Sequence, residues 1–170
     1  MAEQQHFKTT FDSPVGELTL VATGIGLRAV QWPEDEPSRV KLPSPIADST
    51  DNPILTRVIA QLQEYFAGQR TEFDIPLDLR GTDFQQLAWR SLASIPYGQT
   101  ATYGEQARRI GRPKAVRAIG AANGRNPVSI VLPCHRVVGA DGSLTGFAGG
   151  LDAKRRLLEI EIQYSRNPVS

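Results

Sequence analysis

The side chains best suited to covalent chemistry stand next to each other at the end of an apolar run. Cys134, the only cysteine in the 170 residues, and His135, one of two histidines, follow Ile130-Val-Leu-Pro133. A cysteine attacks as its thiolate, which a neighbouring base or positive charge stabilises. The run predicts a buried strand that delivers the thiol to its end, where the imidazole and Arg136 can assist it. Because free cysteines are often simply packed in a core, the neighbouring sequence must decide between a reactive and an inert Cys134.

Two short helices are predicted upstream of this pair. Thr102 and Glu105 have the spacing of a capping box that begins the first helix, and Gly111 ends it. Pro113 suits the first turn of a second helix, which Gly124 ends. Two short helices joined by a glycine-containing turn predict a helix-turn-helix.

Charge is distributed unevenly along the chain. Residues 1–80 carry 7 Lys or Arg and 12 Asp or Glu, a net −5, whereas residues 81–170 carry 12 and 6, a net +6. From 106 to 140 there is no acidic residue, and the basic ones are Arg108, Arg109, Arg112, Lys114, Arg117, Arg125 and Arg136. A patch of one sign on a helix pair favours contact with nucleic-acid phosphates. The alternative is an ordinary solvated face.

The composition excludes several classes of protein. With 40% hydrophobic and 22% charged residues the chain is typical of a soluble globular protein, and no apolar run approaches the roughly 18 residues that a membrane span needs. The polar N-terminus lacks the apolar region of a signal peptide. One cysteine cannot form an internal disulfide, which favours the cytoplasm, and with two histidines it cannot complete a tetrahedral zinc site. We therefore expect a cytoplasmic protein without membrane span, metal or cofactor.

The elements predict an α/β fold of the α+β type with two domains. Residues 1–80 form an N-terminal structural domain with a small antiparallel sheet and a helix. Residues 81–170 form a mostly helical domain with the helix-turn-helix and a short active-site strand. In the first domain we expect three strands, a loop, a helix and an edge strand, at Phe7–Phe11, Leu18–Val21, Leu27–Trp32, Pro33–Asn52, Pro53–Gly68 and Phe73–Leu79.

In the second domain, Thr82 with Gln85 caps a helix that Pro96-Tyr-Gly98 ends. After the helix-turn-helix and the cysteine strand come a glycine-rich loop, a last helix and a frayed tail, at Gly139–Gly150, Asp152–Glu161 and Ser165–Ser170.

Several short motifs occur in order between Asp83 and Glu161. They are Ile95-Pro-Tyr-Gly-Gln, Thr102-Tyr-Gly, Lys114-Ala-Val-Arg-Ala, Asn126-Pro, Pro133-Cys-His-Arg-Val, Gly146-Phe-Ala-Gly-Gly and Lys154 followed by Leu157-Leu-Glu-Ile-Glu161. With these motifs the chain resembles the O6-alkylguanine-DNA alkyltransferase family of direct-reversal DNA repair proteins. The Ser13-Pro-Val-Gly-Glu-Leu segment is also typical of that family.

The resemblance implies a catalytic set. Cys134 is the nucleophile that takes the alkyl group from O6 of guanine, and in the family a water links it to the histidine, here His135. Glu161 holds that histidine, while Glu159 falls two places early and faces elsewhere. A carboxylate behind an imidazole fixes its tautomer and stabilises the imidazolium. Without the resemblance, Glu161 would be interpreted as a solvated helix residue.

The resemblance also implies how DNA is handled. A base inside a duplex cannot present its O6 group to a thiol, so the nucleotide is flipped out. Arg117 fills the vacated space, and Tyr103 presses the adjacent phosphate and contacts the guanine. The second helix is rich in small residues, which suits docking into the minor groove of double-stranded DNA without sequence preference, unless they serve only tight helix packing. Its expected DNA-binding residues are Lys114, Ala115, Arg117, Ala118 and Gly120.

The remaining site residues also come from the resemblance. Asn126 ties the helix-turn-helix to the active-site strand through its side-chain amide, and the substrate pocket is walled by Val137, Phe147, Ala148 and Gly149. Phe147 stands where family members commonly have tyrosine, so a hydroxyl is missing there.

The resemblance implies a stoichiometric, irreversible reaction on O6-alkylguanine and O4-alkylthymine, because no residue here can cleave the resulting thioether. We expect a monomer; cooperative binding along DNA is left open. The alternatives are a sensor that binds alkylated DNA, a helix-turn-helix regulator and a cysteine hydrolase. Sensors lack the cysteine, a regulator needs base-reading side chains on its second helix, and the adjacent Cys134 and His135 beside a basic face argue against a hydrolase.

Overall fold

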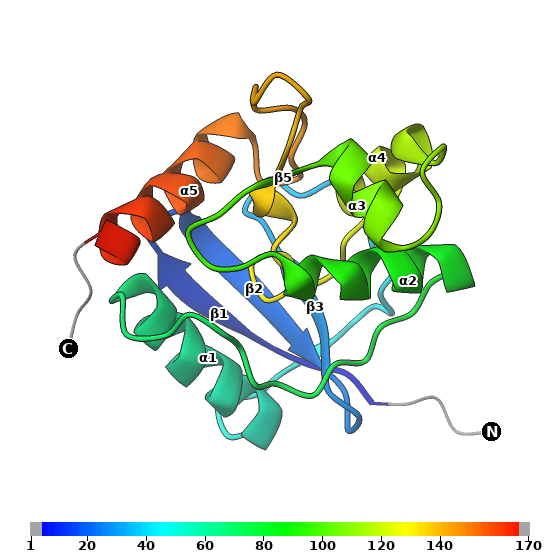
Figure 1. The fold of residues 1–170 in the computed structure, drawn as a ribbon. Helices are drawn as coiled ribbons and strands as arrows, with labels where there is room; N and C mark the ends of the chain where they lie inside the picture. Colours follow the sequence, from blue (N-terminus) through cyan, green and yellow to red (C-terminus); the bar gives the residue numbers. More distant parts are fainter. Residues whose placement is uncertain (1–4, 167–170) are drawn as a thin grey trace.

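The computed structural model describes residues 5–166, which divide into a sheet-containing first half and a mostly helical second half (Figure 1). The first half has a four-stranded sheet of order β3-β2-β1-β4. Strands β1, β2 and β3 are antiparallel neighbours, and the short β4 runs parallel to β1. The strands are β1 (Phe7–Ser13), β2 (Gly16–Ala22), β3 (Leu27–Gln31) and β4 (Ala47–Asp48). The predicted meander is therefore confirmed.

Helix α1 (Pro53–Phe66) packs across this sheet. Its start is set locally, because the Asn52 side chain accepts hydrogen bonds from the backbone N–H groups of Ile54 and Leu55. Its buried face ends in Tyr65, which is fully buried. The sequence predicted this helix, but not the hydrogen bond that Tyr65 donates to Glu161 in the second half of the chain.

Two predictions in the first half need correction. The loop after β3 contains the two-residue strand β4, and the predicted edge strand Phe73–Leu79 is not a strand. That segment runs beside β3 through a single bridge, in which Leu27 N–H donates to Pro76 O at 2.8 Å and Asp78 N–H donates to Leu27 O at 2.8 Å. Pro76 has no N–H group, so the ladder cannot extend through it.

The second half is built from four α-helices and a two-stranded parallel sheet. Its elements are α2 (Asp83–Ser91), η1 (Leu92–Ser94), β5 (Ala101–Thr102), α3 (Tyr103–Arg109), α4 (Val116–Gly124), η2 (Cys134–Arg136), β6 (Val137–Val138) and α5 (Leu151–Arg166). Both predicted capping boxes, at Thr82 and Thr102, are present. Helices α3 and α4 form the predicted helix-turn-helix, although α4 begins three residues after Pro113 because a turn precedes it.

The last helix is longer than predicted and reaches Arg166. Ser165 and Arg166, expected to fray, are therefore helical, while the rest of the expected tail, 167–170, lies outside the described residues. The two halves share one hydrophobic core, which includes Leu18 and Leu62 from the first half and Trp89 and Leu157 from the second.

The apolar run before Cys134 is buried but is not the predicted strand. Its backbone reverses at Ile130, whose φ is 75°, and Cys134 begins the 3₁₀ turn η2. The short strand β6 follows the cysteine instead of preceding it. The prediction was wrong on this point because a short apolar run reports burial and does not by itself distinguish a strand from a turn.

Candidate active site

Cys134 is held at the first position of η2, with 6% of its surface exposed. Its N–H donates to Leu132 O at 2.9 Å. The same carbonyl accepts a hydrogen bond of 2.8 Å from Asn126 Nδ2, and Asn126 Oδ1 accepts one of 3.0 Å from Val128 N–H. Asn126 is fully buried, so its amide closes the loop that follows α4 and fixes the backbone immediately before the thiol.

The residue after Cys134 belongs to a buried imidazole–carboxylate pair. His135 Nε2 is 2.7 Å from Glu161 Oε2, and both side chains are fully buried. Arg136 donates to Glu161 from Nε at 2.8 Å and from Nη2 at 3.0 Å. Burial raises the pKa of Glu161, but the hydrogen bonds and charges of His135 and Arg136 outweigh it and bring the pKa to about 2.

The charge of Glu161 determines which nitrogen of His135 can act as a base. An ionised carboxylate only accepts hydrogen bonds, so His135 Nε2 carries the proton. Its Nδ1 is buried and forms no hydrogen bond with any described residue. Nδ1 therefore carries the free lone pair of the neutral ring.

Arg136 does not assist the thiol as its position in the sequence suggested. Besides binding Glu161, it donates from Nη1 to Ile95 O at 2.7 Å, and its guanidinium lies 5.6 Å from the ring centre of Tyr97. Its charge is thus directed at the carboxylate, away from Cys134.

Cys134 and His135 are both neutral in this resting arrangement. Burial raises the pKa of the Cys134 thiol, against smaller lowering effects from Asn126 and from the charges of Lys154 and Arg39. Burial likewise lowers the pKa of His135, against the raising effect of Glu161. The thiol therefore needs proton transfer before it can attack.

Lys154 is a buried lysine near Tyr103, and the sequence motif that contains it did not indicate a role for it. It is 1% exposed and donates from Nζ to Thr145 O at 3.0 Å. Its Nζ lies 6.0 Å from the ring centre of Tyr103, whose hydroxyl is 2.7 Å from Thr145 Oγ1. These contacts fix the glycine-rich loop to α5 and α3. A lysine three residues before Leu157, in register with the apolar face, was the available signal.

The predicted pocket residues lie around the same core. Val137 is fully buried and lies on β6, where it pairs with Ala101 of β5. Strand β5 ends immediately before Tyr103. Tyr103, Phe147 and Ala148 are partly buried and pack against the cluster that contains Cys134 and Val137.

Two residues of the first half, Trp32 and Arg39, contact predicted site residues of the second half. The sequence did not indicate either contact. Trp32 packs edge-on against Phe147 with ring centres 5.2 Å apart, and Gly149 lies so close that a β-carbon there would be 2.5 Å from the indole. Arg39, ion-paired with Asp35 at 2.7 Å, donates to Asn126 O at 2.7 Å.

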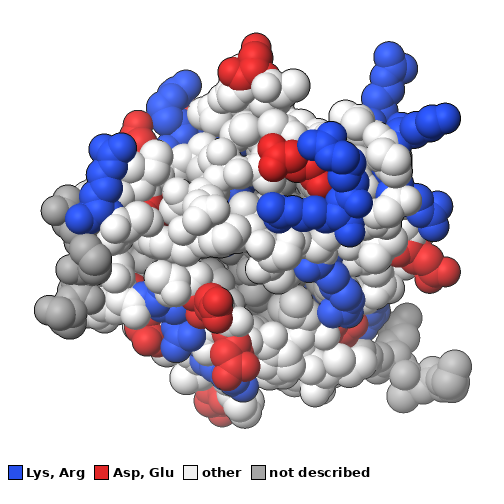
Figure 2. Space-filling model, in the orientation of Figure 1, with Lys and Arg blue, Asp and Glu red and all other residues white. Residues whose placement is uncertain are grey.

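Helix α4 and the turn before it present small and basic side chains on their outer face. Arg117, Lys114 and Ala118 are exposed, Ala115 and Gly120 are partly exposed, and a β-carbon on Gly120 would meet nothing within 4 Å. Packing within the chain therefore does not require a small residue at 120. Figure 2 shows basic side chains over the region of α3 and α4.

The orientation of the helix-turn-helix is fixed from inside. The amides of Gln106 on α3 and Asn123 on α4 exchange hydrogen bonds of 3.1 and 2.8 Å. Gln106 also donates to Ala88 O on α2 at 3.1 Å. The outer face of α4 is thereby held rigidly relative to the core.

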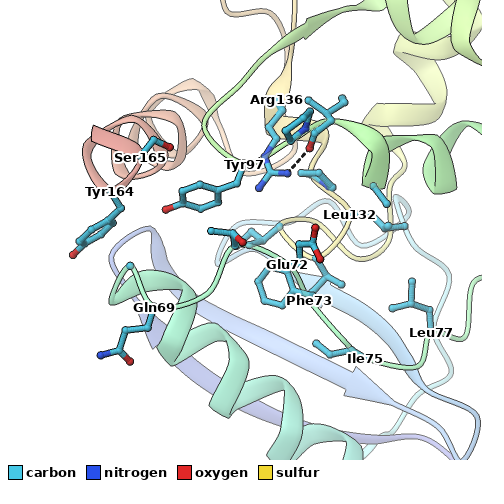
Figure 3. A pocket seen from close by; sticks show the side chains of 18 of the residues that line it. Gln69, Glu72, Phe73, Ile75, Leu77, Tyr97, Leu132, Arg136, Tyr164 and Ser165 are labelled. Atoms are coloured by element: carbon cyan, nitrogen blue, oxygen red, sulfur yellow. Dashed lines mark hydrogen bonds between the residues drawn. The ribbon is translucent and has the colours of Figure 1, made fainter. Parts of the chain in front are cut away.

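A cavity of about 990 Å³ lies beside Arg136 (Figure 3). It lies between residues 68–77 and the segment Ile130–Pro133, with Arg136 and Tyr97 on its wall. Cys134 does not line it, so it is not the predicted guanine pocket.

No group of three His, Cys, Asp or Glu that could bind a metal occurs within residues 5–166. Over that same range, no helix combines the length and apolar character needed to cross a membrane.

The fold and the site together define a class: an α/β protein with a helix-turn-helix and a buried free cysteine, whose neighbouring histidine is paired with a buried glutamate. Two family models match the chain. They are the ribonuclease-like domain of 6-O-methylguanine DNA methyltransferase at residues 6–79, and the DNA binding domain of the same proteins at residues 83–163. The chain belongs to the 6-O-methylguanine DNA methyltransferase family.

Relatives from Mycobacterium tuberculosis are similar over nearly the full length. The methylated-DNA–protein-cysteine methyltransferase of that organism is 52% identical over 167 residues, 96% of this chain and 95% of the relative. The crystal structure of its O6-methylguanine methyltransferase matches with a TM-score of 0.84 and 49% identity, covering 98% and 97% of the two chains. The complex of M. tuberculosis OGT with DNA matches with a TM-score of 0.82 and 47% identity, over 94% and 93%.

Proposed function

We propose that this protein repairs alkylated DNA by transferring the alkyl group from O6-alkylguanine to Cys134, once per molecule. The protein is a methylated-DNA–protein-cysteine methyltransferase of the direct-reversal class, as its family and its 52% identical relative indicate. One observation carries the assignment to Cys134: the next residue, His135, is buried with its Nε2 2.7 Å from Glu161 Oε2.

The relay explains how a neutral thiol becomes a nucleophile. The Cys134 proton passes to His135 Nδ1, through the bridging water that the family resemblance implies, and Glu161 stabilises the imidazolium through Nε2. The thiolate attacks the alkyl carbon, the carbon–O6 bond breaks and its electron pair returns to the guanine, which leaves as the unmodified base once protonated. The new carbon–sulfur bond consumes the thiol, so transfer is stoichiometric and irreversible.

The protein binds double-stranded DNA through α4, which enters the minor groove and does not select a sequence. Support comes from the exposed Lys114 and Arg117, from Ala115 at the N-cap of α4, and from the small residues Ala118 and Gly120 on the outer face of α4. Small side chains let a helix approach the groove closely, and the minor groove discriminates poorly between sequences.

Base flipping completes the proposal. Arg117 takes the place of the flipped nucleotide, and Tyr103 contacts the base from the start of α3. The flipped base is then received between Val137 and the loop of Phe147, Ala148 and Gly149, next to the thiol. O4-alkylthymine is a second substrate in this proposal, and the protein acts as a cytoplasmic monomer.

The decisive experiment is single-turnover transfer from a duplex that contains O6-[³H-methyl]guanine. We expect label to become bound to protein up to one equivalent, with one methyl group on the peptide that contains Cys134. Cys134→Ser is the matched control, because it removes the only thiol in the chain, and it should bind the duplex without becoming labelled. Label released in repeated turnovers would indicate a hydrolase, and binding without transfer would indicate a sensor; either result overturns the proposal.

A further inference from the structure

Tyr65 links the first half of the chain to the relay. It lies near the end of α1, is fully buried, and donates from its hydroxyl to Glu161 Oε2 at 2.6 Å. The same oxygen accepts the hydrogen bond of His135 Nε2 at 2.7 Å. A helix of the domain that sequence analysis considered purely structural therefore contacts the atom that orients the imidazole.

Three aromatic rings pack against the Tyr65 ring. Its ring centre lies 5.0 Å from Phe66, 5.5 Å from Phe73 and 6.0 Å from Tyr97. Tyr97 also lies beside Arg136 on the wall of the cavity in Figure 3. Because the ring cannot turn without breaking these contacts, the hydroxyl is presented to Glu161 from a fixed direction.

We infer that Tyr65 is a positioning residue of the relay, fixing the carboxylate of Glu161 and weakening its pull on His135. This inference rests on the proposed function of the relay. Glu161 Oε2 shares its charge among three donors, Tyr65, His135 and Arg136, and so attracts the proton of each less strongly than it would with fewer donors. Burial and the charge of Glu161 raise the pKa of Tyr65, so its hydroxyl stays protonated and remains a donor.

Removing the Tyr65 hydroxyl should make His135 a stronger base. The titratable and charged groups around His135 and its partner carboxylate are Glu161 and Lys154 from α5, Arg136 and Cys134 from η2, Tyr65 from α1, and Tyr97 from the segment before β5. With one donor fewer, Oε2 concentrates its charge on His135, which favours the imidazolium. A role confined to packing predicts a loss of stability but no change in the titration of His135.

The test compares Tyr65→Phe with Tyr97→Phe. Tyr97 belongs to the same aromatic cluster and has a buried hydroxyl, but this hydroxyl forms no hydrogen bond with any described residue, so its removal is the matched control. The imidazole of His135 is followed by NMR, which is simple because the chain has two histidines. We expect the His135 midpoint to rise by roughly half a unit to one unit in Tyr65→Phe and to stay unchanged in Tyr97→Phe.

The acid limb of the single-turnover transfer rate should move with that midpoint. The plateau rate should fall by roughly threefold to tenfold, well short of the 10²–10⁴-fold that loss of a general base costs. If Tyr65→Phe does not fold, ¹³Cζ-tyrosine spectra of the wild type should show a Tyr65 signal that titrates with His135. A His135 midpoint that is the same in Tyr65→Phe and wild type, or a Tyr65 signal insensitive to His135, overturns the inference. Since NMR needs no DNA, failure here is distinguishable from failure of the proposed function.

Discussion

Replacing Glu161 with glutamine should disable transfer and weaken the fold together. The carboxylate is fully buried and accepts hydrogen bonds from His135, Arg136 and Tyr65. Glutamine has the same shape but leaves the 5% exposed Arg136 without its counter-charge. Breaking a buried ion pair from one side costs about 3–5 kcal/mol of unfolding free energy, a large part of the about 5–15 kcal/mol that a domain has.

The transfer rate should fall by about 10²–10⁴-fold, the usual contribution of general-base catalysis. Glu159→Gln is the matched control: it lies two residues earlier on α5, is exposed, and has only a 4.0 Å contact with Arg156. Single-turnover transfer and urea unfolding measure both effects. Transfer by Glu161→Gln within about threefold of wild type, or an equal loss in Glu159→Gln, would refute the relay.

The pH dependence of wild-type stability checks the same interaction without a substitution. The pKa of Glu161 falls from 4.5 to about 2 in the folded protein, which corresponds to about 3 kcal/mol at 1.36 kcal/mol per unit. Because the folded pKa is the lower one, this stabilisation is complete above pH 4.5 and is lost as the pH falls toward about 2. In Glu161→Gln this component of the acid dependence should be absent.

Three further outcomes are expected. Arg117→Ala should slow repair of duplex DNA at least about tenfold while transfer from free O6-alkylguanine base is unchanged, and the exposed Arg155→Ala should alter neither. Gly149→Ala places a β-carbon 2.5 Å from Trp32 and should cost about 1–3 kcal/mol in urea unfolding, whereas Gly120→Ala meets open space and should cost less. Because burial raises the pKa of Cys134 above 9.0, the thiol contributes stability that is complete below pH 9.0 and lost as the pH rises through the folded pKa; Cys134→Ser should remove this alkaline loss.

Local signals in the sequence predicted the elements well. The capping boxes at Thr82 and Thr102 satisfy the free N–H groups at the start of a helix with neighbouring residues. The proline at the start of α1 has no N–H group to satisfy. Neither effect depends on the rest of the chain. The reversal at Ile130 is different. Its φ of 75° is rare for a β-branched residue, and no local pattern in the sequence indicates it.

The site shows the same division. The positions of Cys134, His135 and Glu161 followed from matching motifs, and the structure pairs His135, the residue after Cys134, with Glu161 at 2.7 Å. The contacts of Tyr65 with Glu161 and of Arg39 with Asn126 join residues 96 and 87 positions apart. From the sequence alone, Tyr65 is only an aromatic residue on an amphipathic helix, and Arg39 is only a basic residue in a loop. Their partners are determined by tertiary packing.

A cysteine that can be used once must also remain unreacted until its substrate arrives. Thiolates, not thiols, react with oxidants and stray electrophiles. Burial raises the pKa of Cys134 and lowers that of His135, so the free protein holds the neutral pair and the ion pair is the state of higher energy. Glu161 raises the pKa of His135 and so reduces the cost of the imidazolium, without making the ion pair the resting state. The charge of Lys154 favours the thiolate but opposes the imidazolium. Reactivity then depends on an electrophilic carbon being placed against the sulfur, which ties consumption of the only thiol to a flipped, alkylated base.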